Sequence, residues 1–355
     1  MADSNTCPQC GVPKYISSEH LWLDNGDIVH SRDQRRRLVF IESENIDPLL
    51  QEVESLIGVS IERIVIDCVK KNVLLPLSAF VPEDLKEKVR RGETDYRSFM
   101  DTFILISSSM GRGKLELKDL RYQRDGNDFC VFRITEPFSL PLNCGARAAG
   151  IEAILGYPQD VTYKKVGEQV YEITVFPSQH TKRQEDRMLP EDYRHQPGTA
   201  RLERCPACGV PKALSECQWN QERGVILNKS TQRRMVMFSP RELDPVFQEL
   251  EKELGEAIPR LVVEAQRRIA KSGFYSLGDV NDLENLRDQF ALRGLGCLRS
   301  SSLSETGMSI RLDNAVLHLM VVGMMQGLFE LTTGLPSIVE WKIDGEDNLE
   351  IEINV

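Results

Sequence analysis

The chain has 355 residues, of which 41% are hydrophobic and 28% charged, and a formal net charge of −10 at pH 7. This length allows two or three domains, and the composition excludes a disordered or collagen-like chain. The negative charge argues against a nucleic-acid partner and against an anionic membrane surface. The start lacks a secretory signal, and the apolar run 315–331 is too short for a membrane span. We therefore expect a soluble, cytoplasmic protein whose cysteines are thiols or metal ligands.

Two distant segments of the chain are nearly identical. Residues 7–14 read Cys-Pro-Gln-Cys-Gly-Val-Pro-Lys, and residues 205–212 read Cys-Pro-Ala-Cys-Gly-Val-Pro-Lys. The match continues without a gap to a Gln-Arg-Arg run in each copy, and an Asp-Pro pair follows, at Asp47 and at Asp244. A period this long is not that of a solenoid. The sequence predicts a tandem repeat of a whole domain, with a second copy that is shorter in its middle.

Each copy divides into a small and a larger unit. The small units, a cysteine knuckle with a hairpin, are expected at 1–40 and 205–240, and the larger units at 41–177 and 241–355. Residues 178–204 are polar, rich in charge and almost devoid of apolar side chains. Such a segment buries too little surface to offset its ordering entropy, so we predict a linker there.

The elements of the first copy follow from turn and helix signals. Asn25-Gly26 is typical of a hairpin turn. At Asp47-Pro48 a helix is expected to begin, with aspartate as cap and proline in the first helical position, and its apolar spacing continues to Cys68. The remaining expected elements are a helix at 96–110, strands at 114–122 and 129–135, a helix at 143–155 and a closing hairpin of 161–165 with 170–175.

The second copy repeats this order. A hairpin is expected around Arg223-Gly224 and a helix from Asp244. The later elements are a helix at 280–292, strands at 297–303 and 308–312, a helix at 314–333 and a closing hairpin of 338–343 with 349–353. Blocks of helices and antiparallel strands predict an α+β fold, with helices packed on an antiparallel sheet in each copy.

This order resembles the 4-vinyl reductase domain family over residues 45–177 and 242–355. A strand pair, the small-residue helix Cys144-Gly145-Ala146-Arg147-Ala148-Ala149-Gly150-Ile151 and a final hairpin with a glycine in its turn carry the resemblance. It implies a fold similar to small subunits of the TRAPP vesicle-tethering complexes, and binding of a small molecule or hydrocarbon. Members often carry cysteines around the final hairpin, but 161–175 and 338–353 contain none. Thiol or metal chemistry is therefore not expected at that hairpin.

The cysteine knuckles carry the sharpest chemical signal. Cys-Pro-x-Cys-Gly is a turn that places two thiolates around a tetrahedral zinc ion, and a structural site needs four ligands. Because each copy supplies two, we predict one zinc-ribbon-like site shared between the copies and joining them as a pseudo-dimer. Its predicted ligands are Cys7, Cys10, Cys205 and Cys208.

Three other interpretations of the knuckles stay open. Each copy can hold its own metal, completed by His20 or His30 in the first and by Cys217 in the second, although these positions do not align. A redox dithiol would favour a helix directly after the first cysteine, which the sequence lacks. The cysteines can also be inert. Four others lie in apolar segments and are expected in the core: Cys68, Cys130, Cys144 and Cys297.

The helix within 315–331 is apolar on nearly all sides and must be buried. It is either a plain core or interface helix, or the wall of an apolar pocket, because methionines adapt to varied ligands. For the second interpretation the candidate lining residues are His318, Met320, Met324, Gly327 and Phe329. His318 by itself is interpreted as a hydrogen-bonded core residue. The arginine runs at 35–37 and 233–234 either grip a carboxylate or form an ion-pair face.

The sequence contains no phosphate-binding glycine loop, nucleophile elbow or zinc-protease helix. We therefore predict a binding or sensory protein for an apolar small molecule, stabilised by a structural zinc, and do not expect catalysis. Two alternatives remain: an enzyme subunit acting on a hydrophobic or tetrapyrrole-like substrate, and a scaffold that binds other proteins. Each of the three functions is compatible with a homo-oligomer or a separate protein partner.

Overall fold

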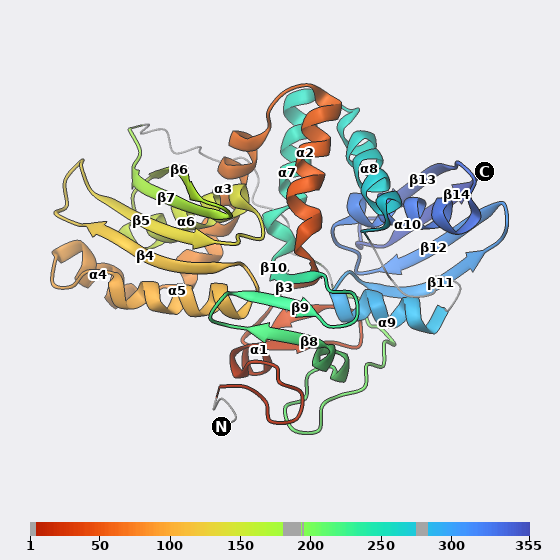
Figure 1. Ribbon diagram of the computed structural model, residues 1–355, viewed down its shortest axis with the longest axis horizontal. Helices are drawn as coiled ribbons and strands as arrows, with labels where there is room; N and C mark the ends of the chain where they lie inside the picture. Colours follow the sequence, from red (N-terminus) through yellow and green to blue (C-terminus); the bar gives the residue numbers. More distant parts are fainter. Residues whose placement is uncertain (1–4, 180–192, 194, 275–282) are drawn as a thin grey trace.

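The computed structural model describes residues 5–179, 193, 195–274 and 283–355. It confirms the α+β class, with helices packed on antiparallel sheets. Figure 1 shows one sheet with its helices on each side of the molecule, the helices α2 and α7 between them, and a layer of short strands below. We call residues 5–179 the first half and residues 205–355 the second half.

The first half contains the following elements: α1 (Lys14–Glu19), β1 (His20–Trp22), β2 (Ile28–His30), β3 (Asp33–Glu42), α2 (Ile46–Ile57), α3 (Glu62–Phe80), α4 (Glu83–Arg91), α5 (Arg97–Ser109), β4 (Lys114–Arg121), β5 (Phe129–Thr135), α6 (Leu140–Leu155), β6 (Gln159–Gly167) and β7 (Val170–Pro177). The second half contains β8 (Cys217–Asn220), β9 (Val225–Asn228), β10 (Arg234–Phe238), the 3-10 turn η3 (Pro240–Glu242), α7 (Asp244–Leu254), α8 (Ile258–Ile269), the π-helical turn η4 (Ala270–Phe274), α9 (Leu283–Arg293), β11 (Cys297–Leu303), β12 (Gly307–Asp313), α10 (His318–Thr333), β13 (Ile338–Ile343) and β14 (Leu349–Asn354).

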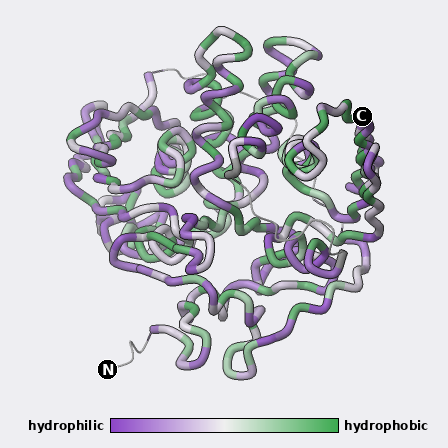
Figure 2. Tube along the Cα trace, turned by 45° about the vertical axis from the view of Figure 1, so that its right-hand side comes forward, coloured by the Kyte–Doolittle hydropathy of each residue, from purple (hydrophilic) through white to green (hydrophobic). Residues whose placement is uncertain are grey.

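The two outer sheets have the same strand order, β4-β5-β7-β6 and β11-β12-β14-β13. Strand β14 alternates buried and exposed residues, and the hydropathy of the trace alternates with it near the C-terminus (Figure 2). On the first sheet α6 packs against α3, and on the second α10 packs against α8. Both crossings need a glycine: a Cβ on Gly145 would lie 2.6 Å from the carbonyl oxygen of Ile66, and one on Gly323 2.4 Å from that of Val263.

A central sheet takes strands from both halves, in the order β1-β2-β3-β10-β9-β8. Strands β3 and β10 pair antiparallel at its middle, with Phe40 opposite Met237 and Val39 opposite Phe238. Above this sheet α2 packs against α8 and α3 against α7, so one hydrophobic core includes residues of both halves. The halves are thus joined by backbone pairing and by apolar burial, independently of any metal.

Each hairpin turn of the central sheet rests on the opposite half. A Cβ on Gly26 would lie 2.2 Å from the carbonyl oxygen of Gly296, and one on Gly224 would lie 2.2 Å from that of Gly113. Only glycine allows backbones to approach this closely. The indole Nε1 of Trp22 also donates to the carbonyl of Leu292, at 3.0 Å. The small units therefore do not stand apart from the larger ones.

The helix predicted from Asp47 to Cys68 is two helices. Gly58, at a φ of 79°, ends α2 in the left-handed conformation, and α3 starts at Glu62. Asp47 does not cap α2 either. Its Oδ2 accepts a hydrogen bond from the backbone amide of Leu140, at 3.3 Å, and Asp244 accepts one from Leu317 in the same way, at 3.2 Å. The aspartates hold the starts of α6 and α10, which lie far away in sequence.

Residues 195–204 of the predicted linker contain no helix or strand but contact both halves. The amide of Ala200 donates to the carbonyl of Asp24 (2.7 Å), and that of Gln196 to the side-chain oxygen of Asn314 (2.6 Å). Most of the remaining linker, 180–192 and 194, lies outside the described residues. Among the described residues, no helix is long and apolar enough to span a membrane.

Candidate functional site

The two cysteine knuckles have the same backbone geometry. The amide of Cys7 donates to the carbonyl of Val12 and the amide of Gly11 to that of Cys7, at 2.8 and 2.9 Å. The second knuckle repeats both bonds at Cys205 and Gly209. The two glycines have φ values of 73° and 78°, in the left-handed region that disfavours any residue with a Cβ. This explains the Cys-Gly pair in both motifs.

The four predicted cysteines lie together. All their Sγ atoms are within 4.8 Å of one another, with 3.9 Å between Cys7 and Cys205 and 3.5 Å between Cys10 and Cys208. Sulfurs about 2.3 Å from a tetrahedral ion are about 3.8 Å apart. Three of the thiols are buried and Cys208 is half-buried. The donor set and its spacing therefore fit one tetrahedral metal ion of the kind that prefers thiolates.

The knuckle backbone favours a thiolate at Cys7. Burial raises the pKa of this thiol, but hydrogen bonds from the backbone of Cys10 and Gln9 and from the thiols of Cys10 and Cys208 together outweigh burial and lower the pKa to about 6. The pKa of Cys10 is raised, because burial outweighs its backbone hydrogen bond with Val12. A metal ion would supply the positive charge that holds the remaining thiols in the ligating, deprotonated form.

The residues of the separate-site interpretation are not part of this cluster. His20 is 3% exposed and its Nδ1 lies 3.2 Å from the carbonyl oxygen of Ile16. Burial lowers the pKa of His20 to about 4. His30 lies 3.4 Å from Glu19, and Cys217 is buried. Cys68, Cys130, Cys144 and Cys297 are buried in the core, as expected.

The candidate pocket residues of α10 are tightly packed. Met320, Met324 and Phe329 are at most 4% exposed, and a Cβ on Gly327 would lie 2.5 Å from the Cβ of Ala270. His318 is half-buried, and burial lowers its pKa to about 4. None of these five residues lines the cavity described below. In the structure they contribute to packing between α10 and its neighbours.

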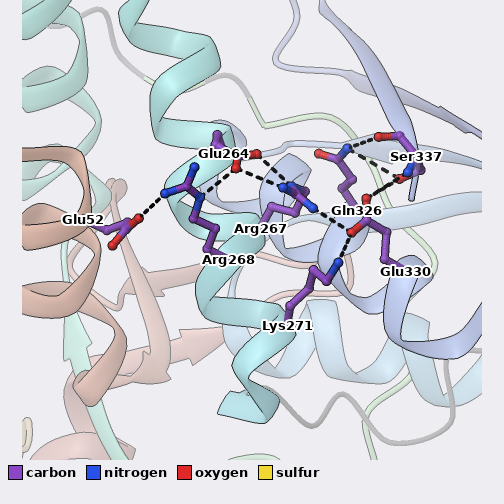
Figure 3. A network of polar contacts seen from close by, with 8 residues as sticks. All are labelled: Glu52, Glu264, Arg267, Arg268, Lys271, Gln326, Glu330 and Ser337. Atoms are coloured by element: carbon purple, nitrogen blue, oxygen red, sulfur yellow. Dashed lines mark hydrogen bonds and ion pairs between the residues drawn. The ribbon is translucent and has the colours of Figure 1, made fainter. Parts of the chain in front are cut away.

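The charged groups beside α10 are fully partnered (Figure 3). The carboxylate of Glu330, 1% exposed, accepts hydrogen bonds from Arg267 at 2.7 Å and from Lys271 at 2.6 Å. Its other oxygen accepts from the amide of Ser337 at 2.9 Å. In the first half, Lys70 and Glu152 form the corresponding ion pair between α3 and α6, at 2.9 Å. Buried charge at these helix crossings is thus neutralised locally.

A cavity of about 630 Å³ lies in the first half, between β3, α3, α5 and α6, with η3 of the second half at one side. Its apolar walls include Val73, Phe80, Phe103, Ile106 and Ile151. Leu75 and Phe80, which are 56% and 38% exposed, place part of this lining at the surface. The volume falls in the range of small-molecule sites, and the mainly apolar lining is typical of them.

The same cavity is rich in arginine. Among the described residues its lining includes six arginines but two carboxylates, Asp33 and Glu242. The arginines are Arg35, Arg36, Arg37, Arg112, Arg147 and Arg241.

Most of these arginines have close partners. Arg35 and Arg36 share Asp33, and Arg112 forms a two-pronged pair with Glu242. Arg37 is buried, 2.6 Å from Asp27, and donates to the carbonyl of Asn314 in the second half. The run 35–37 therefore forms ion pairs, as one of the two predicted roles requires, but these pairs lie within the first half. The same run also faces the cavity.

Arg147, on α6, has no such partner. Its side chain lines the cavity, it is only 8% exposed, and no described residue forms a hydrogen bond or ion pair with it. Burial lowers the pKa of Arg147 to about 10, so the guanidinium stays charged at neutral pH. The hydroxyl of Ser107, also in the cavity wall, is 1% exposed and likewise lacks a hydrogen-bond partner in the described part of the chain.

Sequence reasoning missed this cavity because it assigned the pocket to the methionine helix. The available signal was Arg147 itself, a charge inside the small-residue run of 144–151. At the matching place on α10 stands Met325, which is fully buried. The other lining residues come from elements that lie far apart in the sequence, among them β3, α3, α5 and η3, and no local pattern indicates that these elements meet.

Comparison with known proteins finds no matching family model and no matching curated protein.

Proposed function

We propose that this protein binds a largely apolar small molecule in the cavity of its first half. The observation that carries the proposal is the 630 Å³ cavity with walls of aliphatic and aromatic side chains. Close-packed interiors contain few voids of this size, and apolar surface facing water is unfavourable unless a ligand covers it. The resemblance to 4-vinyl reductase domains in a tandem repeat agrees with this role. A sensory output and a cytoplasmic location are further parts of the proposal.

We also propose that Cys7, Cys10, Cys205 and Cys208 hold one structural zinc. The thiol spacing supports a single tetrahedral ion, and zinc is the metal that four-cysteine structural sites of this kind most often hold. Such an ion would fix the two knuckles against each other at the lower edge of the central sheet (Figure 1). The metal then stabilises the scaffold and does not contact the ligand.

The cavity is tested by filling it. Gly150 lines the cavity on α6, and a Cβ there would be 3.8 Å from its nearest neighbour, Phe103. Gly150→Leu should therefore occupy the cavity without disturbing the backbone. We expect the wild type to bind the neutral fluorophore N-phenyl-1-naphthylamine in a fluorescence titration, and Gly150→Leu to lose this binding while its circular dichroism stays unchanged.

Gly126→Leu is the matched control, because a Cβ on Gly126 has no neighbour within 4 Å and the residue does not line the cavity. It should bind the fluorophore like the wild type. If neither this fluorophore nor its sulfonated analogue binds the wild type in a manner that Gly150→Leu abolishes, the proposed function is wrong. Mass spectrometry of small molecules released from the denatured protein would identify a natural ligand.

A further inference from the structure

Arg147 carries a buried charge that stands apart from other charged groups. Burying an ionised side chain in a low-dielectric environment destabilises the folded state unless the charge is paired. The buried Glu330 on α10 meets this requirement with two cations and a backbone amide (Figure 3). Arg147 is 8% exposed and has no partner among the described residues. A buried charge without a partner in the protein implies a position where a bound anion can pair with it.

The surroundings of Arg147 exclude a counter-charge from the lining itself. The carboxylate of Glu242, in the cavity wall, is already held by both terminal nitrogens of Arg112. Asp33 forms ion pairs with Arg35 and Arg36 at the end of the cavity formed by β3. The lining therefore has more positive than negative groups, although the whole chain carries a net charge of −10. Its local field attracts an anion.

The second half has an apolar residue at the position that matches Arg147. Gly145 on α6 and Gly323 on α10 occupy matching crossings, against Ile66 and Val263, which fixes the alignment of the two helices. In that alignment Arg147 corresponds to Met325, which is 0% exposed. An apolar residue is therefore compatible with this place in the fold. The helix crossing therefore forms without a guanidinium at this position. We assign the guanidinium of Arg147 a role in binding.

We infer that the ligand is an apolar molecule carrying one anionic group, with its apolar body against the aliphatic and aromatic walls and its anion paired with Arg147. This rests on the proposed function. A guanidinium offers parallel N–H donors that match the oxygens of a carboxylate, sulfonate or phosphate. The hydroxyl of Ser107, on α5, lines the same cavity and supplies a further donor that has no hydrogen-bond partner among the described residues. Volume and lining suit a monoanion with an aromatic or branched aliphatic body.

The experiment compares two fluorophores that share one ring system. The sulfonate 8-anilinonaphthalene-1-sulfonate carries an anion, and N-phenyl-1-naphthylamine does not. Because a hydrogen-bonded charge contributes about 1.5–3 kcal/mol, we expect the wild type to bind the sulfonate about tenfold or more tightly than the neutral compound. Arg147→Met should weaken binding of the sulfonate by a similar factor and leave the affinity for the neutral compound unchanged. Arg91→Met, at an exposed arginine of α4 outside the cavity, should change neither.

Equal affinity of the wild type for the two compounds would overturn the inference without any variant. So would sulfonate binding that survives Arg147→Met at full strength. In both cases the proposed function still holds if the wild type binds the neutral compound and Gly150→Leu does not. Loss of all binding from the wild type removes the proposed function instead, so the two failures are distinguishable.

Discussion

At the scale of single residues, the fold changes the pH at which a side chain takes up a proton. His20 is an example. The residue is 3% exposed, its ring lies edge-on to that of Tyr15, and burial lowers its pKa to about 4. The unfolded chain takes up the proton near pH 6.5, whereas the folded one does so only near pH 4. The contribution of neutral His20 to the free energy of unfolding is therefore fully present above pH 6.5. It is lost as the pH falls toward 4, and this loss amounts to up to about 3 kcal/mol.

The substitution His20→Asn tests this. Asparagine keeps a side-chain N–H for the carbonyl of Ile16 but does not titrate. Urea unfolding should show that the free energy of unfolding of the wild type falls more steeply between pH 6.5 and 4 than that of the variant. Parallel pH profiles for the two proteins would show that His20 protonates as easily in the folded state as in the unfolded one.

At the scale of elements, the glycine crossings decide how closely the helices approach. Gly323→Ala places a methyl group 2.4 Å from the carbonyl oxygen of Val263 on α8, a distance that backbone atoms must move to relieve. We expect a loss of about 1–3 kcal/mol in the free energy of unfolding, as for other overpacked sites. Gly345→Ala is the control, because a Cβ there meets nothing within 4 Å. Chemical denaturation of both variants gives the comparison.

The same measurement tests the packing of α10. A Gly323→Ala variant as stable as Gly345→Ala would mean that α8 and α10 are not in close contact. The space that the sequence analysis expected beside Met320 and Met324 could then be open to a ligand after all.

At the scale of the whole molecule, two features join the halves: the cysteine cluster and the shared core beneath α2, α3, α7 and α8. We expect elemental analysis to find one zinc per chain. Cys7→Ser and Cys205→Ser should each lower this occupancy, whereas Cys68→Ser, at a core cysteine, should keep it. Chelation should lower the melting temperature, because a structural metal's binding energy is part of the folding energy.

Removal of the metal should nevertheless leave the halves together. With a protease site inserted between residues 186 and 187, the cut chain should elute as one particle in gel filtration with or without chelator. The pairing of β3 with β10 and the common core supply the reason. Two separate fragments after chelation would show that the metal alone holds the halves, and two zinc ions per chain would restore the separate-site interpretation.

The sequence by itself determined the features that depend on neighbours along the chain. Turn glycines, helical spacing and alternating strands predicted the α+β class and most elements of both halves, and Cys-Pro-x-Cys-Gly predicted which four thiols would meet. In these cases the physical cause is local, because the backbone conformation and the periodicity are set within a few residues. The break at Gly58 was missed because apolar spacing continued across it.

The tertiary structure alone decided where the cavity lies and what faces it. A cavity is space left where β3, α3, α5 and α6 fail to fill the volume between them, and no single segment encodes that space. Whether Arg147 has a counter-charge likewise depends on side chains far away in sequence, among them Glu242, which Arg112 already engages. The methionines of α10 have the composition of a pocket wall, but the fit of Gly327 against Ala270 closes that side. Packing between elements that are distant in sequence therefore decides where the cavity lies and which side chains face it.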